Sequence, residues 1–183
     1  MVILLGGSSH VGKTLFAQKL MEELHYPYVS LDHLKMAFIR TGRTHLTVDD
    51  DAPMRYFLWP FAAEMIKTAI ENGQNLIVEG CYIPENWRDC FEKPYLDRIR
   101  CVFLVMSEAY LRAHFDAVQA YANVIEHRIA DRPDLERLIA CSKGFFRDCI
   151  EYGIPCVEID GAYDPDAILQ KIRGKLGLEN GER

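Results

Sequence analysis

The sequence predicts an α/β protein in which helices cover both faces of a parallel β-sheet. Short apolar runs alternate along the chain with longer segments whose apolar residues recur at helical spacing. The run at residues 2–5 is solidly apolar, as expected of a strand that is buried on both faces of a sheet. The first run, residues 2–5, leads into the glycine-rich stretch GGSSHVGKT and then into a helical segment. Strands separated by helices form parallel sheets, which bind ligands at the carboxyl ends of their strands.

The hydrophobic pattern defines five strands and the helices between them. Strands are expected at residues 2–5, 26–31, 75–80, 99–106 and 155–160. Helices are expected at residues 14–24, 32–40, 54–71, 84–91, 107–130 and 135–150, and again after the Asp164-Pro165 pair. Asp32 and Ser107 are candidate N-caps of the helices that follow them. The polar residues 41–53 are expected to form a loop.

Length and composition favour one globular domain over residues 1–183. Hydrophobic residues make up 49% of the chain and charged residues 26%, which argues against disorder. The net charge of -6 and the scattered basic residues disfavour a nucleic-acid-binding protein. The apolar start is too short for a signal peptide, and no stretch approaches the length of a membrane helix. The six cysteines form no C-x-x-C pair and are expected to be free thiols of a cytoplasmic protein.

The stretch from Gly7 to Thr14 matches the phosphate-binding pattern G-x-x-x-x-G-K-[ST]. A buried strand before it and a helix after it favour a real site over a chance match, because backbone N–H groups at a helix N-terminus can then point at phosphate oxygens. Lys13 is expected to contact the β- and γ-phosphates and Thr14 to bind Mg²⁺. The residues expected to bind the nucleotide are Gly7, Ser8, Ser9, His10, Val11, Gly12, Lys13, Thr14 and Leu15.

His10 is the unusual residue of this loop, because such loops usually carry glycine or another small residue there. If the backbone needs a positive φ at this position, histidine tolerates it better than most side chains. Two alternatives remain open for the imidazole. It stands beside the phosphates or the acceptor, or it points into solvent.

With this loop the sequence resembles the P-loop kinases of small molecules, which share the nucleoside monophosphate kinase fold. The resemblance extends over nearly the whole chain and includes shikimate and gluconate kinases, chloramphenicol phosphotransferases and zeta-toxin-like kinases. It implies a three-layer α/β/α structure with a five-stranded parallel sheet of order 2-3-1-4-5. It also implies ATP as the phosphoryl donor, an acceptor-binding region at about residues 32–72 and a helical lid at about residues 119–134.

Two acidic residues lie at the carboxyl ends of expected strands. Asp32, in VSLDHL, stands where several of these kinases carry an Asp that faces the acceptor hydroxyl, and it is expected to be catalytic and acceptor-binding. The alternative is that Asp32 only caps a helix. Glu79 ends the third strand, where P-loop enzymes place an acidic Mg²⁺ ligand, although usually as Asp. The alternative for Glu79 is a buried acid paired with a cation.

The stretch EHRIADRPDL is the expected lid. Its Arg-Pro-x-Leu ending resembles the lids of shikimate- and gluconate-type kinases. Arg128 and Arg132 share one helix face at i,i+4 spacing and are expected to be catalytic, clamping the transferred phosphoryl group. A solvated helix face with charge pairs is the alternative.

The acceptor site is harder to define from the sequence. Cationic residues are expected to contact the acceptor together with Asp32, namely Arg40, Arg43, Arg55 and Arg88. They favour an anionic acceptor, although the acidic run 49–51 opposes this and such residues are often only solvated. Tyr82 and Trp87 pack either against an acceptor ring or in the core. After the fifth strand, Gly161–Tyr163 are expected to contact the adenine through their backbone.

These features together predict an ATP-dependent phosphotransferase that acts on a small hydroxyl- or phosphate-bearing acceptor, with ATP and Mg²⁺ as cofactors. The chain has no Asn-Lys-x-Asp stretch for guanine, which favours ATP over GTP. A nucleotide-binding regulatory ATPase without a small-molecule acceptor is the alternative. No nucleic-acid or membrane partner is expected, and the sequence fits a monomer or a homodimer.

Overall fold

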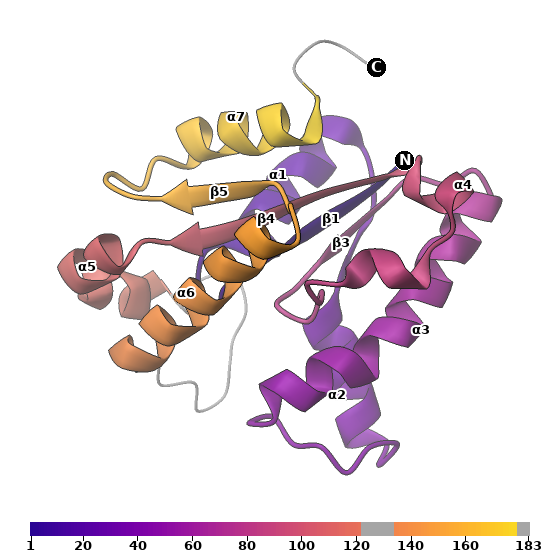
Figure 1. Cartoon of the computed structure of the whole chain (residues 1–183), viewed down its shortest axis with the longest axis horizontal. Coiled ribbons are helices and arrows are strands. Elements are labelled where there is room, and N and C mark those ends of the chain that lie inside the picture. Colours follow the sequence, from indigo (N-terminus) through magenta and orange to yellow (C-terminus); the bar gives the residue numbers. More distant parts are fainter. Residues whose placement is uncertain (122–133, 179–183) are drawn as a thin grey trace.

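A computed structural model describes residues 1–121 and 134–178 of the chain (Figure 1). Five parallel strands form one sheet of order β2-β3-β1-β4-β5, which confirms the expected order. The strands are β1 (Val2–Gly7), β2 (Tyr28–Ser30), β3 (Leu76–Glu79), β4 (Ile99–Met106) and β5 (Cys156–Ile159). The central strand β1 is buried along its whole length, which explains why its sequence is uninterrupted by polar residues.

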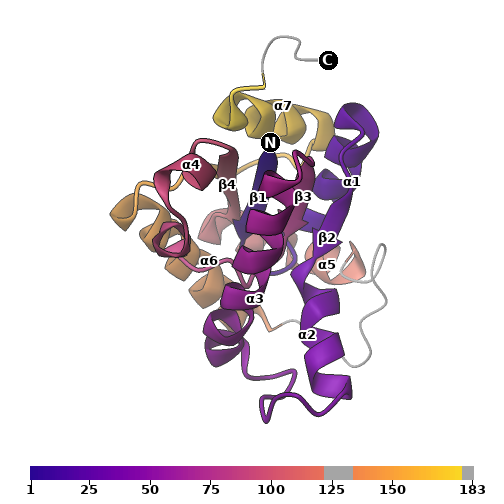
Figure 2. The same cartoon turned by 90° about the vertical axis from the view of Figure 1, so that its right-hand side faces the viewer.

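Helices connect the strands and cover both faces of the sheet, as Figures 1 and 2 show. They are α1 (Lys13–Leu24), α2 (Leu31–Arg40), α3 (Asp51–Glu71), α4 (Lys93–Leu96), α5 (Glu108–Tyr121), α6 (Leu135–Glu151) and α7 (Pro165–Leu176). A 3-10 turn, η1 (Trp87–Cys90), follows β3. Within the described residues, no helix is long and apolar enough to cross a membrane.

Successive residues of β1 belong to two different cores, because strand side chains alternate between faces. Val2 and Leu4 pack with α3, η1 and one side of α6. Ile3 and Leu5 pack with α1, α5, α7 and the other side of α6. Both cores extend to the carboxyl ends of the strands, so the loops that leave this edge have a rigid base.

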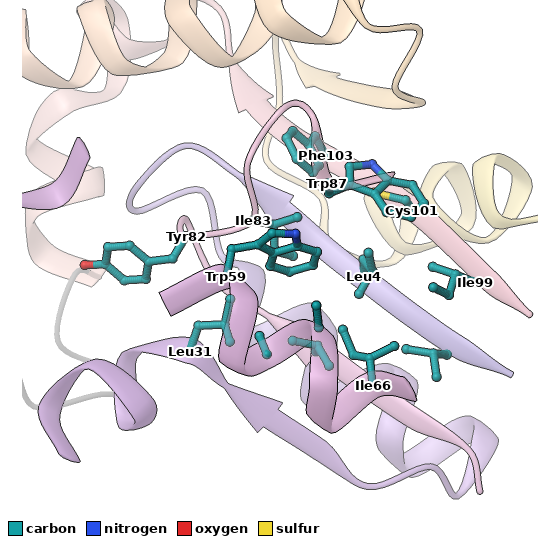
Figure 3. Close-up of a cluster of buried hydrophobic side chains, with 14 of the residues drawn as sticks. Leu4, Leu31, Trp59, Ile66, Tyr82, Ile83, Trp87, Ile99, Cys101 and Phe103 are labelled. Atoms are coloured by element: carbon teal, nitrogen blue, oxygen red, sulfur yellow. The ribbon is translucent and has the colours of Figure 1, made fainter. Parts of the chain in front are cut away.

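The first core contains both tryptophans and much of α3 (Figure 3). Trp59 and Trp87 are each 3% exposed and pack edge-on against Phe91, with ring centroids 6.1 and 6.2 Å away. Of the two roles considered for Trp87, the structure supports core packing. Tyr82 is also buried, but its hydroxyl points away from the cluster (Figure 3).

Several expected boundaries shift in the structure. Helix α3 begins at Asp51 and takes in residues expected to form a loop, since Pro53 is tolerated in a first turn, where N–H groups have no helical partner. Helix α2 begins at Leu31 with Ser30 as N-cap, so the expectation that Asp32 caps the helix is wrong. In residues 84–91 only the 3-10 turn η1 forms, and the short helix α4 was not expected.

Two caps and the state of the cysteines are confirmed. The Tyr110 N–H donates to Ser107 Oγ at 3.0 Å, and Asp164 Oδ1 accepts the Asp166 and Ala167 N–H groups. All six cysteines are free. The expected helix 107–130 is present as α5 up to Tyr121, and its remainder lies outside the described residues.

The packing of α3 on the sheet leads to a stability prediction. Ile66 is 0% exposed, so Ile66→Ala should lower the free energy of unfolding by about 2–5 kcal/mol through lost burial and a residual cavity. Ile150 is 71% exposed, and Ile150→Ala should change it by less than about 0.5 kcal/mol. Urea unfolding followed by tryptophan fluorescence measures both. Equal effects of the two substitutions would contradict the burial of this helix face.

Candidate functional site

The glycine-rich loop joins β1 to α1 in a conformation that needs three positive φ angles. These occur at Gly7 (118°), His10 (60°) and Gly12 (90°). The conformation proposed for His10 on sequence grounds is therefore present, and histidine is among the residues that adopt it more readily. The turn at Gly12 brings the chain into the first turn of α1, whose N–H groups have no helical partner and so favour an anion.

Gly7 lies against β4 with no room for a side chain. A Cβ atom at this position would lie 2.0 Å from the carbonyl oxygen of Leu104. At Gly6 it would lie 2.3 Å from the Phe103 ring. The next residue, Ser8, donates its N–H to the same Leu104 oxygen at 2.9 Å. The start of the loop is thus fixed by backbone contact with the neighbouring strand, which only glycine permits.

Lys13 and Thr14 stand at the start of α1, beside the end of β3. Lys13 is 7% exposed, and its ammonium group donates to the Ser8 carbonyl at 2.7 Å, so it lies over the loop. Thr14 Oγ1 lies 3.5 Å from Glu79 Oε1, at the limit of a hydrogen bond. Glu79 is 1% exposed and ends β3. A hydroxyl and a carboxylate oxygen therefore meet where the loop enters its helix.

These oxygens fit the protein share of a magnesium site. Within residues 1–121 and 134–178, no group of three or more His, Cys, Asp and Glu side chains could hold a metal ion by itself. Mg²⁺ that accompanies a nucleotide needs only one or two protein ligands, because phosphates and water supply the others. The Thr14–Glu79 pair has the right chemistry for this role.

Two residues from distant segments contact the loop. The sequence analysis missed Ser142 and gave Tyr163 a different role. Ser142 of α6 donates to the Met106 carbonyl at 2.7 Å, and its Oγ lies 3.2 Å from Ser8 Oγ. In the sequence, this role could have been indicated by the presence of a serine on the apolar face of α6. Tyr163 donates its hydroxyl to the Val11 carbonyl at 3.3 Å, and burial raises its pKa to about 12. Its side chain therefore braces the phosphate loop, whereas the sequence analysis considered only a backbone contact with adenine.

Asp32 lies in the first turn of α2, directly after β2. The pKa of Cys81 indicates which charges surround it. Burial is the largest cause that raises this pKa, the charges of Asp32 and Asp51 also raise it, Lys13 lowers it, and the result is a pKa of about 11. The charges of Lys13, Asp32 and Asp51 therefore all act on the Cys81 thiol, which lies just after β3.

Asp51 also belongs to a cluster of polar residues that the sequence analysis did not predict. Lys35 is 7% exposed and donates to Tyr82 Oη at 2.6 Å and to the Val48 carbonyl at 3.1 Å. Tyr82 in turn donates to Asp51 Oδ1 at 3.0 Å. Arg137, in the first turn of α6, donates to Asp51 Oδ2 at 3.2 Å. Lys35 is one helical turn after Asp32, a spacing that could have indicated a shared face.

The expected acceptor arginines lie in different environments. Arg55 pairs with Glu85 at 3.6 Å and stacks on Phe145, 4.4 Å from the ring centroid. Arg88 stacks on Trp87 and donates to the carbonyl of Tyr152, near the start of β5 and away from the carboxyl edge of the sheet. Arg40 and Arg43 are exposed at the far end of α2. Arg128 and Arg132 lie outside the described residues.

Residues 2–137 match the AAA_33 family, described as an AAA domain. The match includes the phosphate loop, Asp32, Glu79 and the first turn of α6. It therefore spans well over half of the chain. The chain belongs to the AAA_33 family. No curated protein is similar enough in sequence to count as a relative.

Solved structures of kinases share the fold of this AAA_33 protein. A gluconokinase from Sinorhizobium meliloti 1021 superposes with a TM-score of 0.57 at 19% identity, covering 96% of this chain and 91% of its own. A shikimate kinase from Aquifex aeolicus gives 0.54 at 16% identity, covering 97% and 96%. A sugar kinase from Janibacter sp. HTCC2649 gives 0.58 at 14% identity, covering 97% and 95%. At these identities the similarity establishes a small-molecule-kinase fold.

The charges around Cys81 can be tested in this AAA_33 protein without any substrate. With a pKa of about 11, about one thiol in a thousand is ionised at pH 8, so alkylation should be slow and should rise with pH. Asp32→Asn removes a charge that disfavours the thiolate, so the pKa should fall and the rate at pH 8 should rise severalfold. Iodoacetamide labelling with peptide mass spectrometry measures this, with Asp49→Asn as control. An unchanged rate in Asp32→Asn would mean that Asp32 lies too far away.

Proposed function

We propose that the protein is an ATP-dependent kinase of a small hydroxyl- or phosphate-bearing molecule. The observation that supports this most is the meeting of three features at one edge of the sheet. These are the phosphate loop with Lys13, the Thr14–Glu79 oxygen pair and Asp32. A nucleotide-binding protein without an acceptor needs the first two features but has no use for a carboxylate on the acceptor side.

The donor side of the reaction belongs to the loop and α1. Backbone N–H groups after Gly7 and at the start of α1 would bind the phosphates of ATP, and Lys13 would neutralise charge on the β- and γ-phosphates. Thr14 and Glu79 would hold Mg²⁺, directly or through water. When bound, the ion would balance negative charge on the phosphate oxygens. The chain lacks the guanine-recognition stretch, which supports ATP as the donor.

The acceptor side belongs to α2 and the lid. The acceptor hydroxyl would attack the γ-phosphorus, forming a new O–P bond while the bond to the β-phosphate oxygen breaks and ADP leaves. Asp32 would orient the hydroxyl and take its proton. Arg128 and Arg132 of the lid would stabilise the transferred group, and lid closure would exclude water that otherwise hydrolyses ATP.

Structural similarity supports a small acceptor without naming it. The structures compared above are a gluconokinase, a shikimate kinase and a sugar kinase, each of them named for a small-molecule acceptor. Shikimate itself is a poor candidate here, because the glycine cluster that shikimate-type kinases carry after the third strand is replaced by EGCYIP.

An ADP-release assay distinguishes this proposal from the regulatory ATPase. The full-length protein with ATP and Mg²⁺ is tested against sugars, sugar acids, phosphorylated acids, nucleosides and nucleotides. We expect at least one class to raise ADP release well above the rate without acceptor, with a phosphorylated product detected by mass spectrometry. Stimulation by a protein partner and by none of these compounds would favour the regulatory ATPase.

Lys13→Ala should lower the rate of phosphoryl transfer by about a hundred- to a thousandfold, because a buried cation that stabilises the transferred charge is removed. Lys19→Ala is the matched control on the same helix, since Lys19 pairs with Asp166 on the surface. The rates of both variants are compared with their melting temperatures. If Lys13→Ala retained full activity, this loop would not bind the donor phosphates.

Asp32→Asn should lower kcat by about a hundred- to ten-thousandfold while leaving the affinity for ATP nearly unchanged, because the carboxylate acts on the acceptor. Calorimetric titration with a non-hydrolysable ATP analogue measures the affinity separately from turnover. Asp49→Asn, on the exposed loop before α3, is the control. A parallel loss of ATP affinity would instead make Asp32 a metal-binding or structural residue.

A further inference from the structure

Two consecutive carbonyl groups of the phosphate loop accept hydrogen bonds from different parts of the chain. The Gly12 carbonyl accepts the Phe16 N–H at 3.1 Å, at the start of α1. The Val11 carbonyl accepts the Tyr163 hydroxyl at 3.3 Å. The first donor belongs to the helix that the loop enters. Tyr163 instead lies between β5 and α7, 152 positions after Val11, so the fold brings this hydroxyl to the loop from a distant segment.

The bond from Tyr163 determines which way the Val11–Gly12 peptide faces. Among residues 1–121 and 134–178 no peptide bond is cis, and the C=O and N–H of a planar trans peptide point in opposite directions. Because the Val11 oxygen is turned toward Tyr163, the Gly12 N–H points away from it. In the part of the chain that the structure describes, no protein group accepts this N–H. It is therefore available to an anion in the loop.

The hydroxyl of Tyr163 rests directly on the loop backbone. A Cβ atom at Gly12 would lie 2.2 Å from Tyr163 Oη, so only glycine allows this approach. The ring of Tyr163 packs near the buried Phe16 of α1, with 6.3 Å between ring centroids. The ring is thus held by the helix while the hydroxyl reaches the peptide. Glycine resists rotation of its peptide groups less than other residues, so a peptide next to Gly12 needs such a contact to stay in one orientation.

Tyr163 is suited to this contact by its chemical state. Burial is the main cause that raises the pKa of Tyr163 to about 12, so its hydroxyl keeps its proton and remains a donor at neutral pH. Val11 is 0% exposed, so water cannot replace the hydroxyl at its carbonyl in this conformation. An unpaired buried carbonyl is costly, which would favour rotation of the peptide toward the open side of the loop. There its oxygen would repel a phosphate.

We propose that Tyr163 is a positioning residue for the phosphoryl donor. Its hydroxyl holds the Val11 carbonyl away from the nucleotide and so keeps the Gly12 N–H directed at the phosphates of ATP. This inference rests on the donor half of the proposed function. It assigns a side chain of the segment after β5 to phosphate binding, whereas the sequence analysis expected this segment to contact adenine through its backbone.

Tyr163→Phe tests the proposal, because it removes the hydroxyl and keeps the ring beside Phe16. Calorimetric titration gives Kd for Mg²⁺ with a non-hydrolysable ATP analogue and for Mg²⁺ with tripolyphosphate, which has the phosphates without the adenine. Both Kd values should rise by about three- to tenfold, as expected for one lost hydrogen bond. A rise for the ATP analogue alone would mean that Tyr163 contacts the adenine, and it would overturn the proposal. Two unchanged Kd values would overturn it as well.

The matched control is Tyr95→Phe, which removes a hydroxyl that donates to Glu71 at 2.6 Å. Tyr95 precedes β4 and so lies at the amino edge of the sheet, away from the loop, and both Kd values should stay unchanged. Thermal unfolding of both variants is measured in parallel. A merely structural role of Tyr163 would lower the melting temperature or the number of binding sites per chain without changing Kd. A Tyr163→Phe protein that failed to fold would likewise overturn the proposal.

The outcomes for this inference and for the kinase function are separable. If the wild-type protein bound the ATP analogue while no acceptor raised ADP release, the kinase function would fail and the role of Tyr163 would still stand on the Kd values. If ADP release required an acceptor but Tyr163→Phe changed neither Kd, the inference alone would fail. If the wild-type protein bound neither the ATP analogue nor tripolyphosphate, both would fail.

Discussion

The close approach of β1 to β4 is the constraint on which the site depends. At Gly7 the two backbones leave no space for a Cβ atom, and the Ser8 N–H then bonds to the Leu104 carbonyl that Gly7 faces. This contact fixes where the chain leaves the sheet. The positive φ angles at His10 and Gly12 then turn it back into α1. The loop is held in turn by Ser142 and Tyr163, from segments more than a hundred residues away. The conformation of the phosphate loop therefore depends on contacts from several segments at the carboxyl edge of the sheet.

The parallel sheet also explains why acids and bases gather at this edge. Each strand ends at the same side, so Glu79 at the end of β3, Asp32 after β2 and Lys13 after β1 lie at one edge of the sheet although they are far apart in sequence. The Cys81 thiol lies within reach of these charges: burial is the main cause of its raised pKa, Asp32 and Asp51 raise the pKa as well, and Lys13 lowers it. Glu79 is almost fully buried, and a carboxylate in such a position needs nearby hydrogen-bond donors or cations.

The sequence was sufficient for features that depend on local pattern. The short apolar or strand-like runs predicted all five strands, and the Gly7–Thr14 pattern located the loop between β1 and α1. The sequence was not sufficient where contacts between distant segments determine the position of a side chain. Nothing local distinguishes Asp51, which joins three segments, from Asp49, which is solvated, and nothing local directs Arg88 toward Tyr152. The sequence predicts that Arg43, in the polar loop 41–53, contacts the acceptor, whereas in the structure the Val48 carbonyl of this stretch accepts a hydrogen bond from the buried Lys35.

The cluster of Asp51, Lys35, Tyr82 and Arg137 connects α2 and α3 to α6. Through Lys35 it holds α2, through Tyr82 it holds the turn after β3, and through Arg137 it holds the first turn of α6. Ion pairs of this kind contribute little net stability, because desolvation offsets much of the attraction. Their effect is on position and on local charge. α6 also bonds to the phosphate loop through Ser142, so the same helix contacts both Ser8 and Asp51. Asp51 thus helps to fix the position of α6, the helix that also contacts the phosphate loop.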